Sequence, residues 1–321
     1  MNLLIEANNI SKHYPSQKKG ILAVEDLSLQ IQPGQLYGLL GPDGAGKTTT
    51  LRILATTLSP SHGAARVAGY DIRKEKEKIR KRIGYMPQNF SLYPDLTVRE
   101  NMTFFADINE VKSGIREQRI KEMLAFTRLD SFQSRKAQNL SGGMKKKLAL
   151  ACSLMHDPEI LILDEPSTGV DPVSRRELWL ILSRVVQNAV SVLVSTPYMD
   201  EAERCNEVAV LYEGKLLAQG NPQELEAELP FDIVEYKVQP RKTMYSTVEA
   251  LPGMINFRPI GDRLRLSVEN AQQAIRLLRW RLTKQRKQAQ ILRKAKLTME
   301  DVFMNLMVSR QEAVPVRIEN R

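Results

Sequence analysis

Apolar and polar positions alternate along parts of the first 70 residues, and short continuous apolar runs follow further along the chain. Alternation over Ile21–Ile31 and over residues 66–70 predicts strands with one buried face. Continuous apolar runs at Leu36–Leu40, residues 160–163 and residues 190–194 predict strands that are covered on both faces. The pattern therefore indicates a parallel sheet core with an antiparallel portion near the amino terminus.

Helical stretches lie between these runs, notably at residues 145–155 and 174–187. Strands that alternate with helices are typical of an α/β fold. The sequence Tyr212-Glu213-Gly214-Lys215 predicts a hairpin turn that closes this part of the chain. The mixed-charge run at residues 73–82 predicts a solvated helix face.

Beyond residue 230 the pattern predicts a second, smaller unit with a βαββαβ order. Its expected elements are strand 233–239, helix 243–251, strand 254–258, strand 263–269 after a Gly261-Asp262 turn, helix 270–285 and strand 290–295. Charge changes at the same place. Basic and acidic residues number 29 and 28 up to residue 230, and 18 and 9 after it. We therefore expect one α/β domain over 1–230 and a basic α+β accessory domain over 231–321.

Composition narrows the class of protein. The 321 residues are 42% hydrophobic and 26% charged, which is ordinary for a globular chain and excludes intrinsic disorder and fibrous repeats. Two cysteines far apart make neither a disulfide framework nor a zinc site. The amino terminus lacks the features of a secretory signal, and the longest apolar runs are too short to cross a bilayer. We expect a soluble protein.

A glycine-rich loop follows the apolar run that ends at Leu40 and precedes a helical stretch. Its glycines let successive backbone N–H groups point at phosphate oxygens, and the helix beginning at Lys47 adds its positive end. Lys47 would reach the β- and γ-phosphates, and the Thr48 hydroxyl would bind Mg²⁺. The predicted phosphate-binding residues are Gly41, Pro42, Asp43, Gly44, Ala45, Gly46, Lys47, Thr48 and Thr49.

Two acids and a second glycine pair complete the candidate chemistry. Asp164 and Glu165 follow a buried strand, so Asp164 is expected to support Mg²⁺ and Glu165 to act as general base on water. Ser141, Gly142 and Gly143 open another helix and form a second anion site. Because one loop already serves one nucleotide, the second site is expected to serve a nucleotide held by another chain.

These motifs, in this order, resemble the ATP-binding cassette of ABC transporters over residues 3–220. The motifs are the phosphate loop, Gln88 in YMPQNF, LSGGM, ILILDEP and STGVDP. The resemblance implies a P-loop cassette with a mixed sheet and a helical subdomain, in a head-to-tail dimer that encloses two ATP molecules. It also implies that Tyr14 stacks on adenine, that Gln88 contacts the γ-phosphate and Mg²⁺, and that Asp171 shapes the dimer seam.

Further segments are similar to the ATPase subunits of ABC-2 type exporters: YMPQNFSLYPDLTVREN, STPYMDEAERC and LTMEDVFMNL. The similarity implies an ATPase on the cytoplasmic face of the plasma membrane that drives efflux through separate transmembrane permeases. The second ATPase is either an identical chain or a different one. An alternative class is a non-transport ABC ATPase that acts on ribosomes or nucleic acid. The single cassette without sustained heptads favours the exporter.

The chain departs from the family pattern at one position. Where the family carries a histidine that contacts the γ-phosphate, this chain has Pro197, and its three histidines lie elsewhere in the sequence. Proline has neither an ionisable group nor a backbone donor. Either the chain's own site is slow and its LSGGM serves a different ATPase, or Glu165 suffices and a homodimer hydrolyses ATP slowly.

Residues 276–296 contain nine basic residues and no acid. Three explanations remain open at this stage: a solvated surface, contact with anionic lipid headgroups, and binding to nucleic-acid phosphates. Because of the similarity to exporters, we do not expect nucleic acid to be a partner.

Overall fold

The computed structural model describes residues 3–15, 20–89 and 92–313, and it divides into two compact units, Met1–Pro222 and Gln223–Arg321. The boundary between the units lies at residues 222 and 223, before the predicted boundary at residue 230. Helix α8 (Pro222–Ala227) therefore falls largely in the second unit. There Glu226 on α8 forms an ion pair with Lys296. Of the quoted YMPQNFSLYPDLTVREN segment, Phe90 and Ser91 lie outside the described residues.

The first unit contains a six-stranded sheet in the order β10-β9-β3-β8-β7-β6. Five of these strands, β3, β6, β7, β8 and β9, run parallel to one another, and β10 is antiparallel to β9. The bounds are β3 (Leu36–Leu40), β6 (Ile83–Met86), β7 (Ile160–Asp164), β8 (Ser191–Thr196), β9 (Glu207–Tyr212) and β10 (Lys215–Gly220). Every residue of β3, β7 and β8 is buried, as their continuous apolar runs predict.

A second sheet in this unit is antiparallel, in the order β2-β1-β4-β5. Its strands are β1 (Ile5–Tyr14), β2 (Ile21–Ile31), β4 (His62–Val67) and β5 (Tyr70–Asp71). The prediction of one strand over residues 66–70 is wrong. Ala68 and Gly69 both adopt positive φ, of 51° and 80°, and make a tight turn between β4 and β5. The predicted turn at Glu213 and Gly214 is confirmed, with φ of 48° and 80°.

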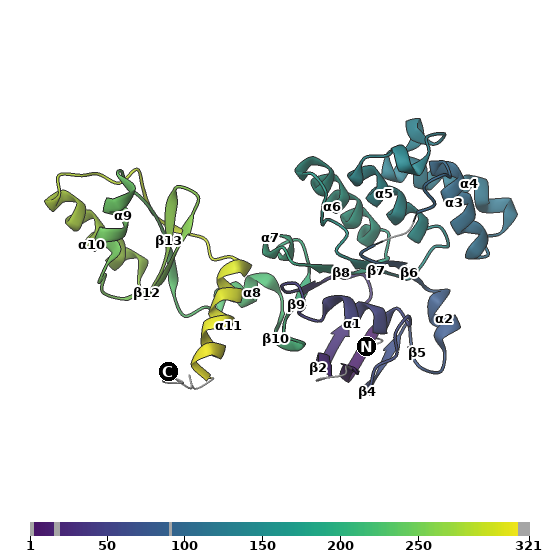
Figure 1. Cartoon of the computed structure of the whole chain (residues 1–321), viewed down its shortest axis with the longest axis horizontal. Helices are drawn as coiled ribbons and strands as arrows, with labels where there is room; N and C mark the ends of the chain where they lie inside the picture. The colour runs from purple at the N-terminus through teal and green to yellow at the C-terminus, as the bar shows by residue number, and fades with distance from the viewer. Residues whose placement is uncertain (1–2, 16–19, 90–91, 314–321) are drawn as a thin grey trace. The chain divides into compact units, whose positions relative to one another are not determined.

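Helices cover the six-stranded sheet on both faces, with α1 between the two sheets and α5 and α6 on the opposite face (Figure 1). The helices are α1 (Lys47–Leu54), α2 (Lys76–Arg80), α3 (Val98–Ile108), α4 (Ser113–Thr127), α5 (Gly142–Ser153), α6 (Pro172–Gln187) and α7 (Met199–Ala202). Both α5 and α6 begin before their predicted starts because Ser141 and Asp171 cap them. The charged run at 73–82 forms only the short α2, which buries Ile79.

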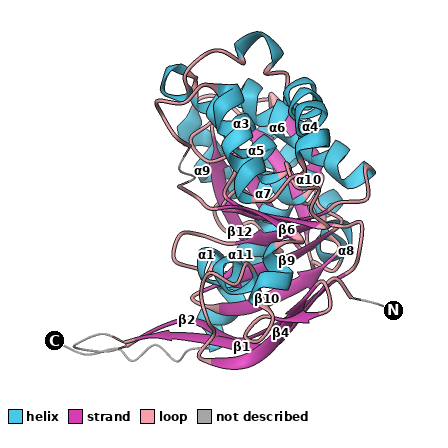
Figure 2. Cartoon of the chain, turned by 90° about the vertical axis from the view of Figure 1, so that its right-hand side faces the viewer, coloured by secondary structure: helices cyan, strands magenta, loops and turns pink. Residues whose placement is uncertain are grey.

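The second unit has the predicted βαββαβ order and then a terminal helix. Its elements are β11 (Asp232–Lys237), α9 (Arg241–Val248), β12 (Met254–Ile260), β13 (Arg263–Val268), α10 (Ala271–Lys284), β14 (Ile291–Ala295) and α11 (Met299–Ala313). The strands form an antiparallel sheet in the order β12-β13-β11-β14. Apolar residues of α9 and α10 pack on one face of this sheet and form a separate core. Figure 2 shows both units coloured by secondary structure.

Across the residues that the structure describes, no helix is both long and apolar enough to span a bilayer.

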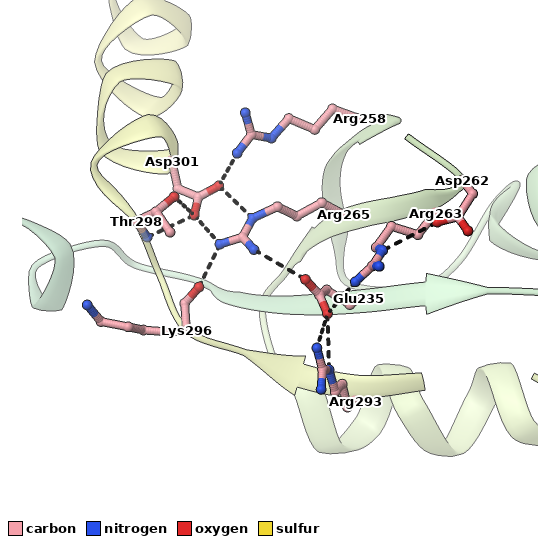
Figure 3. A network of polar contacts seen from close by, with 9 residues as sticks. All are labelled: Glu235, Arg258, Asp262, Arg263, Arg265, Arg293, Lys296, Thr298 and Asp301. Atoms are coloured by element: carbon pink, nitrogen blue, oxygen red, sulfur yellow. Dashed lines mark hydrogen bonds and ion pairs between the residues drawn. The ribbon is translucent and has the colours of Figure 1, made fainter. Parts of the chain in front are cut away.

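Polar residues tie the start of α11 to the second unit's sheet (Figure 3). The buried Asp301 carboxylate accepts hydrogen bonds from Arg265 Nε and Nη2 at 3.1 and 2.6 Å and from Arg258 Nη2 at 2.9 Å. It also accepts from the backbone N–H and the hydroxyl of Thr298, the residue before α11, at 3.0 and 2.8 Å. Asp301 of the LTMEDVF segment therefore fixes the start of α11 to the sheet, which is a structural role. Burial disfavours the charged carboxylate, but the bonds from Arg265 and Thr298 outweigh it and lower the pKa of Asp301.

Replacement of Asp301 by asparagine is expected to lower the free energy of unfolding of the second unit by about 3 kcal/mol, because two arginines lose their buried partner. Hydrogen exchange of peptides from residues 254–308 measures the change. Asp262→Asn, at an exposed ion pair with Lys237, is the control and should cost under about 1 kcal/mol. Since the native pKa of Asp301 is depressed, its contribution is present above the unfolded pKa and disappears as pH falls through the native value. Equal effects of the two substitutions would contradict the structural role of Asp301.

Candidate functional site

The loop between β3 and α1 follows a path that requires glycine at its two ends. Gly41 has φ of 153°, and a Cβ there would lie 2.3 Å from the Leu211 carbonyl oxygen. Gly46 has φ of 99° and caps α1, and its Cβ would lie 2.5 Å from the Ala23 carbonyl oxygen. Neither contact leaves room for a side chain, so the backbone can wrap tightly before α1 begins at Lys47.

Lys47 is buried at the centre of this loop and is 3% exposed. Its ammonium donates to the carbonyl oxygens of Gly41 and Pro42 at 2.8 and 3.0 Å. It also lies 3.3 Å from Glu165 Oε1 at the end of β7. The loop thus surrounds the Lys47 ammonium with backbone carbonyl groups. The acid that pairs with Lys47 follows a strand that lies more than 100 residues later in the sequence.

Asp164 precedes Glu165 and is fully buried. Its Oδ1 accepts hydrogen bonds from Ser195 Oγ at 2.7 Å and from Thr48 Oγ1 at 3.2 Å. Its Oδ2 is buried without a hydrogen-bond partner among the described residues. A buried carboxylate oxygen that lacks a donor, beside a threonine hydroxyl, suits a hard cation such as Mg²⁺. Within the described ranges no group of three or more His, Cys, Asp or Glu residues could hold a metal.

Glu165 connects three segments of the site. Its backbone has positive φ, 47°, a conformation that non-glycine residues rarely adopt. Its backbone N–H donates to Ser195 Oγ at 3.0 Å, and its Oε2 accepts from Gln88 Nε2 at 3.0 Å and from Thr168 Oγ1 at 3.2 Å. The same carboxylate therefore contacts Lys47 through one oxygen and Gln88 through the other.

A cleft of about 490 Å³ lies over the phosphate loop. Its lining includes the largely apolar side chains of Tyr14, Ile21 and Leu22 as well as the phosphate loop, Gln88 and Glu165. Tyr14 therefore lies in the wall of the same cleft as the phosphate loop. The lining residues are Tyr14, Ile21, Leu22, Ala23, Asp43, Gly44, Ala45, Gly46, Lys47, Thr48, Thr49, Gln88, Glu165 and Glu213.

The predicted second anion site does not line this cleft. Ser141 caps α5, its hydroxyl accepting from Met144 N at 3.3 Å. Gly142 instead lines a separate cleft of about 600 Å³, to which Gln88 and Thr168 also contribute. Gly143 packs against α6, where a Cβ would lie 2.4 Å from Ser174 Oγ. The structure therefore brings together Tyr14, the loop, Gln88, Asp164 and Glu165, and leaves the glycine pair outside.

The segment after β8 carries Pro197 and no histidine. Near it Glu201 is fully buried and accepts four hydrogen bonds: from Arg175 at 2.6 Å, Trp179 at 2.8 Å, Ser167 at 3.0 Å, and Thr196. Ser167 belongs to the segment that follows Glu165. Glu201 thus holds the segment of Pro197 against the segment that leads to Asp171.

His13, His62 and His156 are not among the described residues that line the cleft. His156 Nε2 lies 3.0 Å from the Ile83 carbonyl oxygen, and burial lowers the pKa of His156. Asp171 caps α6 by accepting hydrogen bonds from Val173 N and Ser174 N at 3.1 and 3.0 Å. These bonds lower the pKa of Asp171, and the bond from Ser174 has the larger effect.

Sequence reasoning missed two polar residues of the site. Ser195 bridges Asp164 and the Glu165 backbone, and it stands in the Ser-Thr pair that marks the position of the absent histidine. Lys146 on α5 donates to the Gln88 carbonyl oxygen at 3.3 Å. Burial lowers the pKa of Lys146, while the charges of Glu165 and Asp164 oppose that shift. Only the packing of α5 against the loop of Gln88 reveals Lys146, because nothing in its local sequence marks it.

Fold and site together define a P-loop nucleotide-binding cassette, and known proteins resemble it. The ABC transporter family matches residues 24–168. The probable multidrug ABC transporter ATP-binding protein YbhF of Escherichia coli (strain K12) is 47% identical over 222 residues, covering 69% of this chain and 38% of that protein. The Nod factor export ATP-binding protein I of Cupriavidus metallidurans is 38% identical over 237 residues, covering 73% of this chain and 77% of that protein.

Solved structures agree with the fold. A dimeric ATP-binding cassette bound to ADP and Pi in a post-hydrolysis state has a TM-score of 0.63 and 26% identity, covering 68% of this chain and 98% of that one. An ATP-binding subunit of an ABC transporter has a TM-score of 0.63 and 28% identity, covering 70% of this chain and 92% of that one.

The chain therefore belongs to the ABC transporter family of ATP-binding proteins. It spans only 38% of the length of its YbhF relative and 77% of its Nod factor export relative.

Proposed function

We propose that this chain binds and hydrolyses ATP as the energy-coupling subunit of an ABC-2 type exporter. It would drive efflux through separate transmembrane permeases from the cytoplasmic face of the membrane. The observation that carries the proposal is the cleft in which Glu165 lies within hydrogen-bond reach of both Lys47 and Gln88. The names of relatives that act in multidrug transport and in Nod factor export support the direction of transport.

The residues of the cleft divide the work on the nucleotide. Tyr14 would contact the adenine, and residues 41–49 would surround the phosphates with backbone N–H groups. Lys47 would exchange its contact with Glu165 for the β- and γ-phosphates, since a triphosphate carries more negative charge than one carboxylate. Glu165 is then free to accept a proton from the attacking water, which Gln88 helps to orient.

Thr48, Asp164 and Gln88 would hold the Mg²⁺ that accompanies ATP. The ion, when bound, neutralises charge that develops on the phosphate oxygens. Among these residues Asp164 offers the buried oxygen without a donor. Ser195 keeps the other oxygen of Asp164 occupied and thereby fixes the orientation of the carboxylate.

The glycine pair supports a site that two chains share. Ser141, Gly142 and Gly143 lie outside the cleft of their own chain, so they would close over a nucleotide held by another one. Asp171, at the start of α6, would lie along that seam. The solved relative that forms a dimer with ADP and Pi supports this arrangement.

Pro197 supports an asymmetric pair as the finer form of the proposal. The chain's own site would hydrolyse ATP slowly, while its glycine pair completes a faster site on a different ATPase. A homodimer in which Glu165 alone sustains slow turnover is the alternative. The basic second unit would contact anionic lipid headgroups of the same membrane.

Affinity purification from detergent-solubilised membranes tests the proposal. We expect the tagged chain to retain a multi-span permease, and identification of the retained ATPase separates a homodimer from a mixed pair. Recovery of ribosomal proteins in place of a permease would instead establish the non-transport class of ABC ATPase and overturn the exporter.

A further inference from the structure

The outer surface of helix α10 combines an exposed tryptophan with unpaired cations. Trp280 is 55% exposed, and Arg276, Arg279 and Lys284 beside it in sequence are exposed as well. Arg286, just after the helix, is also exposed. In the described part of the chain none of these four cations forms an ion pair with an acid. By contrast, Arg293 and Lys294 of β14 are paired with Glu235 and Asp232.

This surface is rigid because α10 is fastened to α9. Arg281 donates to the carbonyl oxygens of Thr247, Glu249 and Ala250, at 2.7, 2.7 and 2.9 Å, where α9 ends. The inner side of α10 buries Leu278 and Leu282 in the core of the second unit. The cations and the tryptophan therefore stand on a preformed helix face and need no folding step to meet a partner.

We propose that this face of α10, defined by Arg276, Arg279, Trp280 and Lys284, binds the anionic headgroups of a phospholipid bilayer. The proposal rests on the exporter function above and adds a site within the second unit. Unpaired cations and phosphate headgroups are complementary in charge. An indole whose ring is apolar and whose N–H is polar is the side chain that suits the boundary between headgroups and acyl chains.

The same residues fit a bilayer better than a nucleic acid. The Lys284 ammonium lies 3.7 Å from the centre of the Trp280 ring, so it covers one face of the indole. Stacking on a base would have to displace this cation–π contact or use the other face alone. A headgroup layer needs no stacking, and the single helix presents its charges in a short row rather than along a groove.

The two tryptophans of the chain make the contact measurable. Trp179 is 2% exposed in the first unit, so Trp280 is the tryptophan whose surroundings change when the surface binds. We expect the full chain to sediment with vesicles of phosphatidylcholine and phosphatidylglycerol, with a blue shift of emission and quenching by brominated lipid. Vesicles of phosphatidylcholine alone should give neither, and salt should weaken the binding. Trp280→Phe should remove the spectral change.

The triple variant Arg276→Gln, Arg279→Gln, Lys284→Gln is expected to lower the partition coefficient about a hundredfold, because each basic residue near a charged surface contributes a factor of about five. The control variant Lys74→Gln, Lys112→Gln, Lys121→Gln removes the same charge from exposed positions of the first unit and should bind as the parent does. Both variants should retain ATP, so that a lost lipid contact is distinguished from a failed cassette.

Equal binding to neutral and anionic vesicles, equal losses in the two triple variants, or an unchanged Trp280 spectrum would overturn the proposal. So would a chain that ignores vesicles and binds single-stranded RNA with a dependence on the same cations. Absence of both interactions would leave the face as ordinary solvated surface, which also contradicts the proposal.

Discussion

Replacement of Glu165 by glutamine is expected to slow ATP hydrolysis by about 10²–10⁴-fold and to leave ATP bound. The amide keeps the size of the side chain and its contact with Gln88 but cannot accept a proton from water. It also removes the negative charge that faces Lys47 at 3.3 Å, which leaves the ammonium freer to bind phosphate. Phosphate release by the purified full chain measures the rate, and equilibrium dialysis measures ATP retention.

Glu110→Gln is the matched control for this substitution. Glu110 is an exposed carboxylate that pairs with Lys81 on the surface of the first unit. Its loss should change neither hydrolysis nor retention. Should Glu165→Gln hydrolyse ATP at the parent rate, Glu165 is not the general base, and the role assigned to the β7 carboxylate pair fails.

Replacement of Pro197 by histidine is expected to raise the hydrolysis rate of the chain's own site on the order of 10²-fold or more. An imidazole supplies the electrostatic and proton-transfer contact that proline lacks. The surrounding framework is already in place, because Glu201 accepts hydrogen bonds from Thr196, next to Pro197, and from Ser167 of the segment that follows Glu165. The rate of phosphate release at saturating ATP is the measurement.

Pro197→Ala separates the imidazole from the backbone change. Alanine restores an N–H and removes the ring, but it has no side-chain donor, so its rate should stay close to the parent's. A parent chain that already hydrolyses ATP as fast as the histidine variant would refute the asymmetric pair. A gain with alanine as large as that with histidine would assign the effect to the backbone.

Much of the fold follows from apolar patterning because the core strands are buried on both faces. The runs at β3 and β7 consist almost wholly of apolar residues for that reason, and the second unit's helices and strands separate at clear turns. Periodicity does not encode which strands become neighbours. The order β10-β9-β3-β8-β7-β6 places β3 between strands that come more than 150 residues later, and only long-range packing decides it.

The candidate site, like the fold, could be predicted from the sequence only in part. The phosphate loop can be found in the sequence because a chain that wraps a phosphate needs its glycines and lysine in one short segment. Lys146 and Ser195 come to the site from α5 and β8, and their neighbours carry no signal of that position. Glu201 stands in an acidic run that is typical of an exposed surface, yet four donors from other segments keep it fully buried.

The most direct test of the central claim, that the loop around Lys47 holds the triphosphate, is equilibrium dialysis of Mg-ATP against the full chain and its Lys47→Ala variant. We expect the parent to retain ATP and the variant to bind it at least about 100-fold more weakly, since two charge-assisted bonds to phosphate are lost. The surface variant Lys78→Ala, from α2, should bind as the parent does. Retention of ATP by Lys47→Ala at the parent's affinity would contradict the account.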